Sequence, residues 1–203
     1  IEKTNLENAA QGIKTFNMKG CNVTIPYKVD IIPYLDKVEK NALLIGAVNT
    51  IKNVNDELIG YNTDGIGFIK SLTDEGYDLK GKKVIILGAG GACRSIAVEL
   101  ANNEVSYIEI RNRSEKNAKS ICDLINSNFQ SKANYNIKPV EENDLNSFDI
   151  LINTTPIGME PKDCPIDVNI NPPKNLLVCD IVYKPHETML LSWAKKNNLN
   201  VVH

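Results

Sequence analysis

The second part of the chain alternates short apolar runs with segments of helical spacing. The apolar runs, typical of strands buried on both faces of a sheet, lie at 84–87, 107–110, 149–153, 176–180 and 201–202. The helical segments lie at 95–101, 115–126 and 187–197. Strands that alternate with helices predict a parallel α/β sheet with right-handed crossovers. We expect residues 134–146 to be a polar connector within this sheet.

The first part of the chain has a different pattern. Short strands are predicted at 22–25, 47–51 and 57–61, and helices at 31–40 and 64–72. Asn55-Asp56 separates the last two strands and predicts a hairpin turn. We therefore expect a smaller, partial α/β substrate domain at residues 1–77, followed by a doubly wound sheet at 78–203.

Composition and charge narrow the class of protein. The net charge is −2, which argues against the basic surface of a nucleic-acid-binding protein. The chain has no run of about 18 apolar residues, so no membrane span is expected. Five widely spaced cysteines without a CxxC pair indicate thiols in a reducing cytoplasm and no disulfide framework. No cluster of His, Cys and Asp has the spacing of metal ligands, so we expect no metal.

A glycine-rich turn separates the predicted strand 84–87 from the predicted helix 95–101. Gly88 and Gly90 fill the first two positions of a GxGxxG motif, and Cys93 takes the third. Such glycines allow a tight turn and let the backbone approach a pyrophosphate, which the helix N-terminus then binds. The pattern predicts a Rossmann-type dinucleotide site; a plain strand-to-helix turn is the alternative.

The end of the next strand indicates which dinucleotide binds. An NAD site places Asp or Glu there to bind the ribose hydroxyls. This strand instead ends in Arg-Asn-Arg-Ser at 111–114, and Glu109 lies too early to serve. Arg113 and Ser114 suit the 2′-phosphate of NADP, since a guanidinium pairs well with phosphate oxygens. The alternative is that Arg113 is a solvated surface charge.

Polar residues also follow the short strands of the first part. Reduction of a carbonyl requires a proton for the developing alkoxide, and an ammonium group such as Lys28 can supply it. Asp64 could orient Lys28, while Asn49 and Thr24 could hold a polyol. Considered singly, Lys28 is as easily a surface lysine and Asp64 a helix N-cap.

Taken together, these segments resemble shikimate dehydrogenase. The matching stretches, in the family's order, are NVTIPYK at 22–28, IGAVNT at 45–50, GYNTDG at 60–65, GAGGA at 88–92, NRS at 112–114, NTTPIGM at 153–159 and DIVYKPHET at 180–188. The resemblance implies NADPH-dependent reduction of 3-dehydroshikimate to shikimate in aromatic amino-acid biosynthesis.

The resemblance also implies roles for single residues. It makes Lys28 and Asp64 the catalytic pair, with Thr24, Asn49 and Tyr183 contacting the substrate. The residues that it assigns to NADP(H) are Gly88, Ala89, Gly90, Gly91, Ala92, Asn112, Arg113, Ser114, Thr155 and Met159. A small-molecule substrate is then expected, without a nucleic-acid or membrane partner, and a homodimer stays open.

Three features depart from the family's pattern. Asn117 occupies a position that is commonly basic, which weakens the expected preference for NADP, and Cys93 replaces a small residue. An N-terminal segment with a Ser-x-Ser pair and a C-terminal segment with a glutamine are expected but lie outside the sequence. Two alternatives remain: a quinate/shikimate dehydrogenase that uses NAD, and a non-catalytic NADP-binding module.

Overall fold

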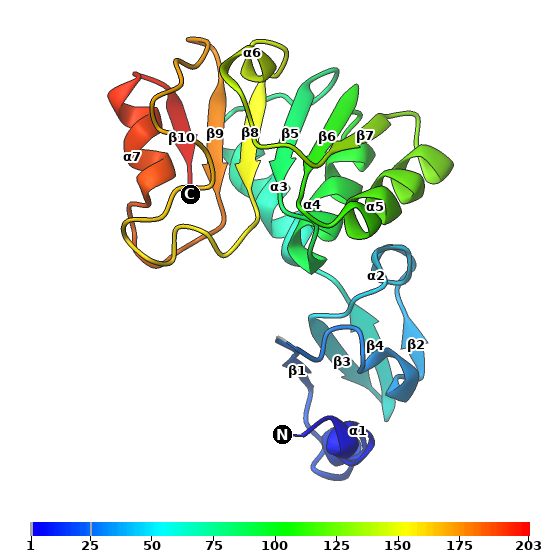
Figure 1. Cartoon of the computed structure of the whole chain (residues 1–203). Helices are drawn as coiled ribbons and strands as arrows, with labels where there is room; N and C mark the ends of the chain where they lie inside the picture. The colour runs from blue at the N-terminus through cyan, green and yellow to red at the C-terminus, as the bar shows by residue number, and fades with distance from the viewer. Residues whose placement is uncertain (1, 25) are drawn as a thin grey trace. The chain divides into compact units, whose positions relative to one another are not determined.

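The computed structural model describes residues 2–24 and 26–203 (Figure 1). The chain forms two compact units, Ile1–Gly67 and Phe68–His203, and the division falls inside helix α3 (Asp64–Asp74). The structure thus divides the chain N-terminal to the boundary predicted at 77–78. Each unit has a sheet of its own.

The first unit is built on a four-stranded sheet with the order β1-β3-β4-β2. Its strands are β1 (Gly20–Asn22), β2 (Lys37–Val38), β3 (Thr50–Val54) and β4 (Glu57–Tyr61). Its helical elements are the 3₁₀ turns η1 (Lys3–Asn5) and η2 (Ile32–Tyr34) and the helices α1 (Leu6–Thr15) and α2 (Lys40–Ile45). The buried faces of α1 and of the sheet share one apolar core that includes Leu6, Ile13, Ile51 and Leu58.

The β3–β4 hairpin is confirmed, including its turn, although its first strand lies at Thr50–Val54 and not at the predicted 47–51. Val54 pairs with Glu57, and the two residues between them have φ angles of 52° at Asn55 and 64° at Asp56. Two successive left-handed residues are what a tight hairpin turn requires, and Asn and Asp tolerate that conformation. The hairpin pairs Thr50 with Tyr61 at its open end. The polar residues that precede β3 and follow β4 are thereby brought close together.

Two predictions for the first unit are wrong. The strand expected at 22–25 lies earlier, at Gly20–Asn22, while Val23 and Thr24 are irregular and Ile25 is outside the described residues. A Cβ at Gly20 would lie 2.2 Å from the carbonyl oxygen of Ile51, so only glycine allows β1 to approach β3 this closely.

The helix expected at 31–40 is replaced by η2 and β2. Pro33 lacks an N–H and limits the helical segment to one turn. Asp36 then accepts a hydrogen bond of 2.7 Å from the backbone N–H of Leu58 in β4. Pairing with the sheet edge therefore overrides the helical spacing of this segment.

The second unit is a six-stranded sheet with the order β10-β9-β8-β5-β6-β7, and every neighbouring pair is parallel. Its strands are β5 (Lys83–Leu87), β6 (Tyr107–Arg111), β7 (Lys132–Asn136), β8 (Ile150–Asn153), β9 (Leu177–Asp180) and β10 (Asn200–Val202). Its other helices are α4 (Gly91–Asn102), α5 (Glu115–Asn128), α6 (Glu142–Leu145) and α7 (Met189–Lys196). The order is that of a Rossmann fold, which confirms the predicted fold class.

Both faces of this sheet are covered, as the apolar runs predict. Ile85 and Leu87 share a core with Leu190 and Trp193 of α7. Because successive side chains of a strand point to opposite faces, Ile86 belongs to the other face, and it is fully buried as well. A parallel sheet covered in this way needs near-continuous apolar strands.

The polar connector predicted at 134–146 is wrong, because it contains most of β7 and the short helix α6. β7 is an edge strand with alternating polar residues, so it lacks the apolar run by which the inner strands are identified. The side chain of Asn126 in α5 bonds both backbone groups of Ala133 at 2.8 Å. This contact satisfies the free edge of the strand locally.

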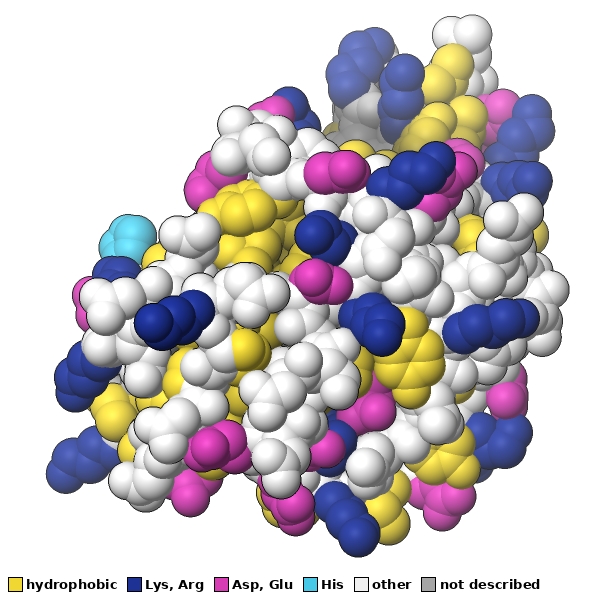
Figure 2. All heavy atoms as spheres, turned by 90° about the horizontal axis from the view of Figure 1, so that it is seen from above, with side chains coloured by type: hydrophobic (Ala, Val, Ile, Leu, Met, Phe, Trp, Pro, Cys, Tyr) yellow, Lys and Arg dark blue, Asp and Glu magenta, His cyan; other side chains and the backbone are white. Residues whose placement is uncertain are grey.

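Charged side chains are mixed on the surface. On the face seen in Figure 2, Lys and Arg side chains are interspersed with Asp and Glu. Within residues 2–24 and 26–203, no helix is both long and apolar enough to cross a membrane.

Candidate functional site

The glycine-rich turn of the second unit lies where the strand order reverses. The chain runs outward from β5 to β6 and β7, then returns to β8 on the other side of β5. In such sheets ligands bind outside the carboxyl ends of the strands at this reversal. The segments that follow β5, β6 and β8 are therefore the candidates for a nucleotide site.

Gly88 fits this turn because no other residue could occupy it without strain. Its φ is 102°, and a Cβ would lie 2.8 Å from Oγ1 of Thr154. Thr154 in turn donates from Oγ1 to the carbonyl of Leu87 at 2.7 Å. The turn after β5 and the loop after β8 are thus packed directly against each other.

The helix α4 begins immediately after this turn. Gly90 is its N-cap in an extended conformation, and no side chain caps the helix. A Cβ at Gly90 or Gly91 would meet no atom within 4 Å, so the space beside both glycines is open. The first N–H groups of a helix have no partner inside it and carry a partial positive charge, which suits a pyrophosphate.

Cys93 follows as part of α4 and is fully buried. Burial raises the pKa of its thiol to about 12, against a smaller opposite effect of a hydrogen bond with Thr154. The thiol therefore stays neutral and serves as a packing residue beneath the turn.

The residues after β6 lie on the surface near α5. Asn112 donates from Nδ2 to the carbonyl of Ser114 at 3.0 Å. Ser114 is the N-cap of α5, and its hydroxyl makes no capping hydrogen bond. Arg113 lies between them and is exposed. One guanidinium and one hydroxyl are thus presented together at the N-terminus of a helix.

A pocket of about 480 Å³ joins these segments. Its lining contains six of the residues predicted for the cofactor, namely Gly88, Ala89, Gly90, Asn112, Arg113 and Thr155. The remaining four are not part of the lining: Gly91 and Ala92 form the first turn of α4, Ser114 caps α5, and Met159 is an exposed residue of the loop after β8. The volume falls in the usual range for small-molecule sites.

Sequence reasoning missed part of the pocket wall. The segment 137–140 lines it, although it was expected to be only a connector. Arg111 lines it as well and is buried beside Glu109. An arginine at a strand end was the available signal, but Asp144 and the carbonyls of Lys138 and Pro139, which it also contacts, lie far along the chain.

A buried polar network supports the loops after β8 and β9. Asp180 accepts from Nδ2 of Asn153 at 3.0 Å, from Oγ1 of Thr188 at 2.7 Å and from the N–H of Val182 at 3.0 Å. Burial raises the pKa of Asp180, while the three donors oppose that shift. The network holds the loop start at Thr155, whose N–H and hydroxyl both bond Asn153.

Tyr183 lies in the loop after β9, three residues beyond the network's aspartate. Its side chain is 73% exposed. It therefore stands free to contact a ligand, as the predicted substrate role requires.

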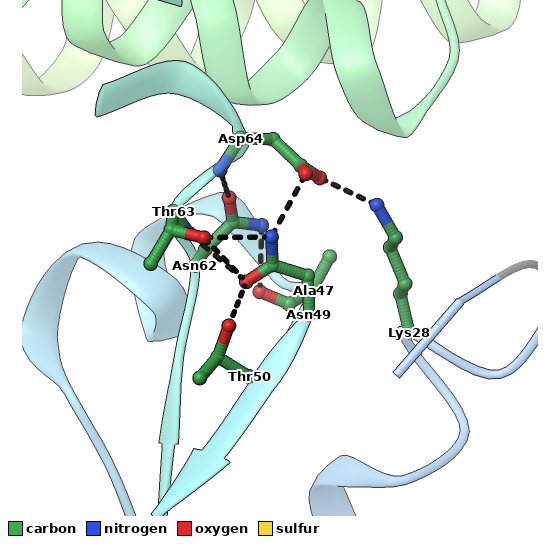
Figure 3. A network of polar contacts seen from close by, with 7 residues as sticks. All are labelled: Lys28, Ala47, Asn49, Thr50, Asn62, Thr63 and Asp64. Atoms are coloured by element: carbon green, nitrogen blue, oxygen red, sulfur yellow. Dashed lines mark hydrogen bonds and ion pairs between the residues drawn. The ribbon is translucent and has the colours of Figure 1, made fainter. Parts of the chain in front are cut away.

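The first unit brings together three of the residues predicted for substrate chemistry (Figure 3). Nζ of Lys28 lies 2.5 Å from Oδ2 of Asp64, and Nδ2 of Asn49 donates to the other carboxylate oxygen at 2.8 Å. The side chains of Lys28 and Asp64 keep 28% and 30% of their surface exposed. The pair is thus fixed by neighbours yet reachable by a ligand.

Asp64 is the first residue of α3 and not its N-cap, which was the alternative for this residue considered singly. Its backbone N–H donates to Oδ1 of Asn62, a buried residue whose Nδ2 donates to the carbonyl of Ala47. Asn49 accepts from both the N–H and the hydroxyl of Thr63. The segment between β4 and α3 is therefore held by asparagine side chains, which leaves the carboxylate of Asp64 for Lys28.

Thr24 is not part of this network. Its side chain is exposed, and its carbonyl accepts the N–H of Tyr27 at 2.9 Å. The neighbouring N–H of Val23 bonds the carbonyl of Asn49 at 2.8 Å. The turn that carries Lys28 is thereby tied to the start of β3.

Chemically, the first unit offers an ammonium group held by a carboxylate, with amides and hydroxyls around them. Such a group can donate a proton to a developing alkoxide or stabilise its charge. The second unit offers a glycine turn, a helix N-terminus and a guanidinium. These suit a phosphorylated dinucleotide.

Comparison with protein families finds two matches along the chain. Residues 1–51 match the shikimate dehydrogenase substrate binding domain, and residues 70–159 match shikimate / quinate 5-dehydrogenase. A curated relative from Methanococcus vannielii, "Shikimate dehydrogenase (NADP(+))", is 43% identical over 215 aligned positions. The alignment covers 100% of this chain and 72% of that relative.

Solved structures agree with this result. A ligand-free 5-ketofructose reductase of a Gluconobacter strain is 35% identical, with a TM-score of 0.91. Shikimate 5-dehydrogenase from Listeria monocytogenes, in complex with shikimate and NAD, is 33% identical, with a TM-score of 0.90. Each comparison covers 100% of this chain and 73% of the other. The chain belongs to the shikimate dehydrogenase family.

Proposed function

We propose that the protein catalyses the NADP-dependent interconversion of 3-dehydroshikimate and shikimate, a step of aromatic amino-acid biosynthesis. The observation that carries the proposal is the Lys28–Asp64–Asn49 cluster in a chain of this family. NADP(H) supplies or accepts the hydride when bound. The protein's own residues then handle the proton, the substrate hydroxyls and the charge.

Lys28 is the proposed proton donor during reduction. Its ammonium group carries three N–H bonds, one of which donates to the carboxylate of Asp64. The other N–H bonds can donate to a substrate. An alkoxide that forms on the substrate would accept a proton from this group or be stabilised by its charge. In the oxidation direction, the same nitrogen would start as the neutral amine and become the ammonium group by taking the proton from the substrate hydroxyl.

Asp64 and Asn49 are the proposed orienting groups. Asp64 holds the ammonium with one carboxylate oxygen, and Asn49 holds the other oxygen. With both oxygens engaged, the carboxylate cannot rotate freely, so the position of Nζ is defined. Orientation of this kind lowers the barrier by fixing the proton donor before reaction. Thr24 and Tyr183 are proposed as further substrate contacts on the family resemblance.

The residues of the second unit fit NADP(H). The open space beside Gly90 and Gly91 admits a pyrophosphate at the N-terminus of α4. Arg113 and the hydroxyl of Ser114 are proposed to hold the 2′-phosphate, with Asn112 fixing the turn between them. Ala89 and Ala92 accompany the glycines, and Thr155 and Met159 are the proposed residues on the nicotinamide side.

Two finer proposals concern the cell and the assembly. All five cysteines are free thiols, which is consistent with a cytoplasmic location. A homodimer is retained as a hypothesis.

A related substrate or cofactor is the second candidate. It is favoured by the likeness to a 5-ketofructose reductase and to a relative in complex with NAD. Values of kcat/KM for shikimate, quinate and 5-ketofructose, each with NADP and NAD, separate the candidates. We expect shikimate with NADP to give the largest value. A larger value for another pair would replace the proposal, and NADP binding without turnover of any substrate would favour a non-catalytic module.

A further inference from the structure

We propose that Arg111 is a specificity-determining residue that makes the adenosine end of the pocket acceptable to a 2′-phosphate. This inference rests on the proposed function and adds to it a residue that does not itself bind the phosphate. Arg111, which lines the pocket, pairs with the carboxylates of Glu109 and Asp144 and holds two carbonyls of the pocket-lining segment 137–140.

Arg111 is held from several sides at once. Its Nε lies 2.5 Å from Oε1 of Glu109, and its Nη2 lies 2.9 Å from Oδ2 of Asp144. Its Nη1 donates to the carbonyls of Lys138 at 3.4 Å and Pro139 at 3.1 Å. Only 6% of the side chain is exposed, so the guanidinium is fully committed to these partners.

The position of Arg111 links it to the proposed subsite. It is the last residue of β6, directly before Asn112, and it lines the same pocket as Arg113. The two carbonyls that it binds belong to the segment 137–140, which also lines that pocket. Arg111 therefore connects the strand end, where the phosphate is proposed to bind, to a second segment of the pocket lining.

The charges around Arg111 do not balance. One guanidinium faces two carboxylates, those of Glu109 and Asp144. Neither Glu109 nor Asp144 lines the pocket, but both contact Arg111, which does. Uncompensated carboxylates at this place would repel a phosphate more than a neutral ribose hydroxyl. Without Arg111, both carboxylates would be uncompensated near the subsite, and the preference would shift from NADP toward NAD.

Asp144 keeps a second partner if Arg111 is replaced. Oδ2 of Asp144 also accepts the N–H of Glu141 at 2.8 Å, in the capping box of α6. Glu109 lies on β6, two residues before Arg111 and on the same face of the strand. The carboxylate of Asp144 is thus held independently of the guanidinium, and Glu109 remains on the same face of β6 as residue 111.

The test compares dissociation constants of NADP and NAD by isothermal titration calorimetry, in the whole protein without substrate. We expect Arg111→Met to weaken NADP binding by roughly tenfold, the scale of a charge repulsion in a partly solvated site, with a smaller loss for NAD. Adding Glu109→Gln and Asp144→Asn to Arg111→Met should restore most of the NADP-to-NAD ratio. Equal weakening of both cofactors in Arg111→Met would overturn the proposal and leave Arg111 a structural residue.

A second variant keeps the test decisive if Arg111→Met does not fold. The double variant Glu109→Gln, Asp144→Asn retains Arg111 and removes both carboxylates, so it should bind NADP more tightly while NAD changes little. An unchanged ratio in this variant would refute the proposed charge effect. If the wild type binds neither cofactor, the proposed function itself fails; if it binds NADP and only the ratios do not move, this inference alone fails.

Discussion

Replacing Lys28 with methionine should abolish most turnover with little effect on folding. The change keeps the length of the side chain and removes the ammonium group that lies 2.5 Å from Asp64. General acid–base catalysis contributes roughly 10²–10⁴-fold to a rate. At about 1.36 kcal/mol per tenfold, the expected loss of transition-state stabilisation is about 3–5.5 kcal/mol.

The first unit contains a matched control for this change. Nζ of Lys14 lies 2.7 Å from Asp36, and the side-chain exposures of that pair are 24% and 40%, close to those of Lys28 and Asp64. Each pair should contribute about 0.2–1 kcal/mol to folding, so both variants should lose a similar, small amount of stability. Only the Lys28 variant should lose turnover.

The assay is steady-state oxidation of shikimate with NADP in the whole protein, together with urea unfolding of each variant. We expect kcat to fall in Lys28→Met much more than KM rises, because the group acts mainly in the transition state. Lys14→Met should keep kcat within about twofold, since a surface ion pair of this kind affects only stability. Unchanged kcat in Lys28→Met, or an equal loss in both variants, would refute the reasoning.

Three further predictions concern single residues. Arg113→Ala should weaken NADP binding by roughly 10- to 150-fold and leave NAD binding unchanged, measured by calorimetry, because one charge-assisted contact is lost; equal losses would make Arg113 structural. Gly88→Ala should destabilise the protein and weaken NADP binding more than the control Gly76→Ala. Both glycines have a positive φ, but only the Cβ added at Gly88 would meet a neighbouring atom. Equal effects of the two variants on thermal unfolding and on NADP binding would contradict this. The N–H of Leu58 and the ammonium of Lys14 lower the pKa of Asp36 in the folded state, so its contribution to stability is present above the unfolded value of about 3.9 and is lost as the pH falls through the folded pKa. Asp36→Asn should therefore flatten the acid limb of the stability–pH curve, and an unchanged limb would count against this assignment.

The parallel sheet was predictable because its inner strands are buried on both faces. Apart from Lys83 at the start of β5 and Asp180 at the end of β9, these two strands are apolar, so the pattern identifies them directly. β7 was not predicted, because an edge strand needs no continuous apolar run and its polar residues are typical of a connector. The helix predicted at 31–40 failed since pairing of β2 with β4 outweighs a local preference.

The candidate site was predictable only in part. The glycine turn follows from local sequence, because strand, turn and helix are contiguous. Lys28 and Asp64 are 36 residues apart. The residue types alone suggested that Asp64 could orient Lys28, but a surface lysine and a helix N-cap fitted them equally well until the family resemblance was considered. Arg111 was missed because Asp144 and the carbonyls it binds come from a segment that the sequence presents as a polar loop.

The central claim is that this chain couples the oxidation of shikimate to the reduction of NADP. The most direct test measures both products in one reaction, starting from shikimate, NADP and the whole protein. The proposed function predicts that 3-dehydroshikimate and NADPH form in equal amounts, and that neither forms in the Lys28→Met variant at a comparable rate. NADP that binds tightly while shikimate is left unchanged would contradict the claim.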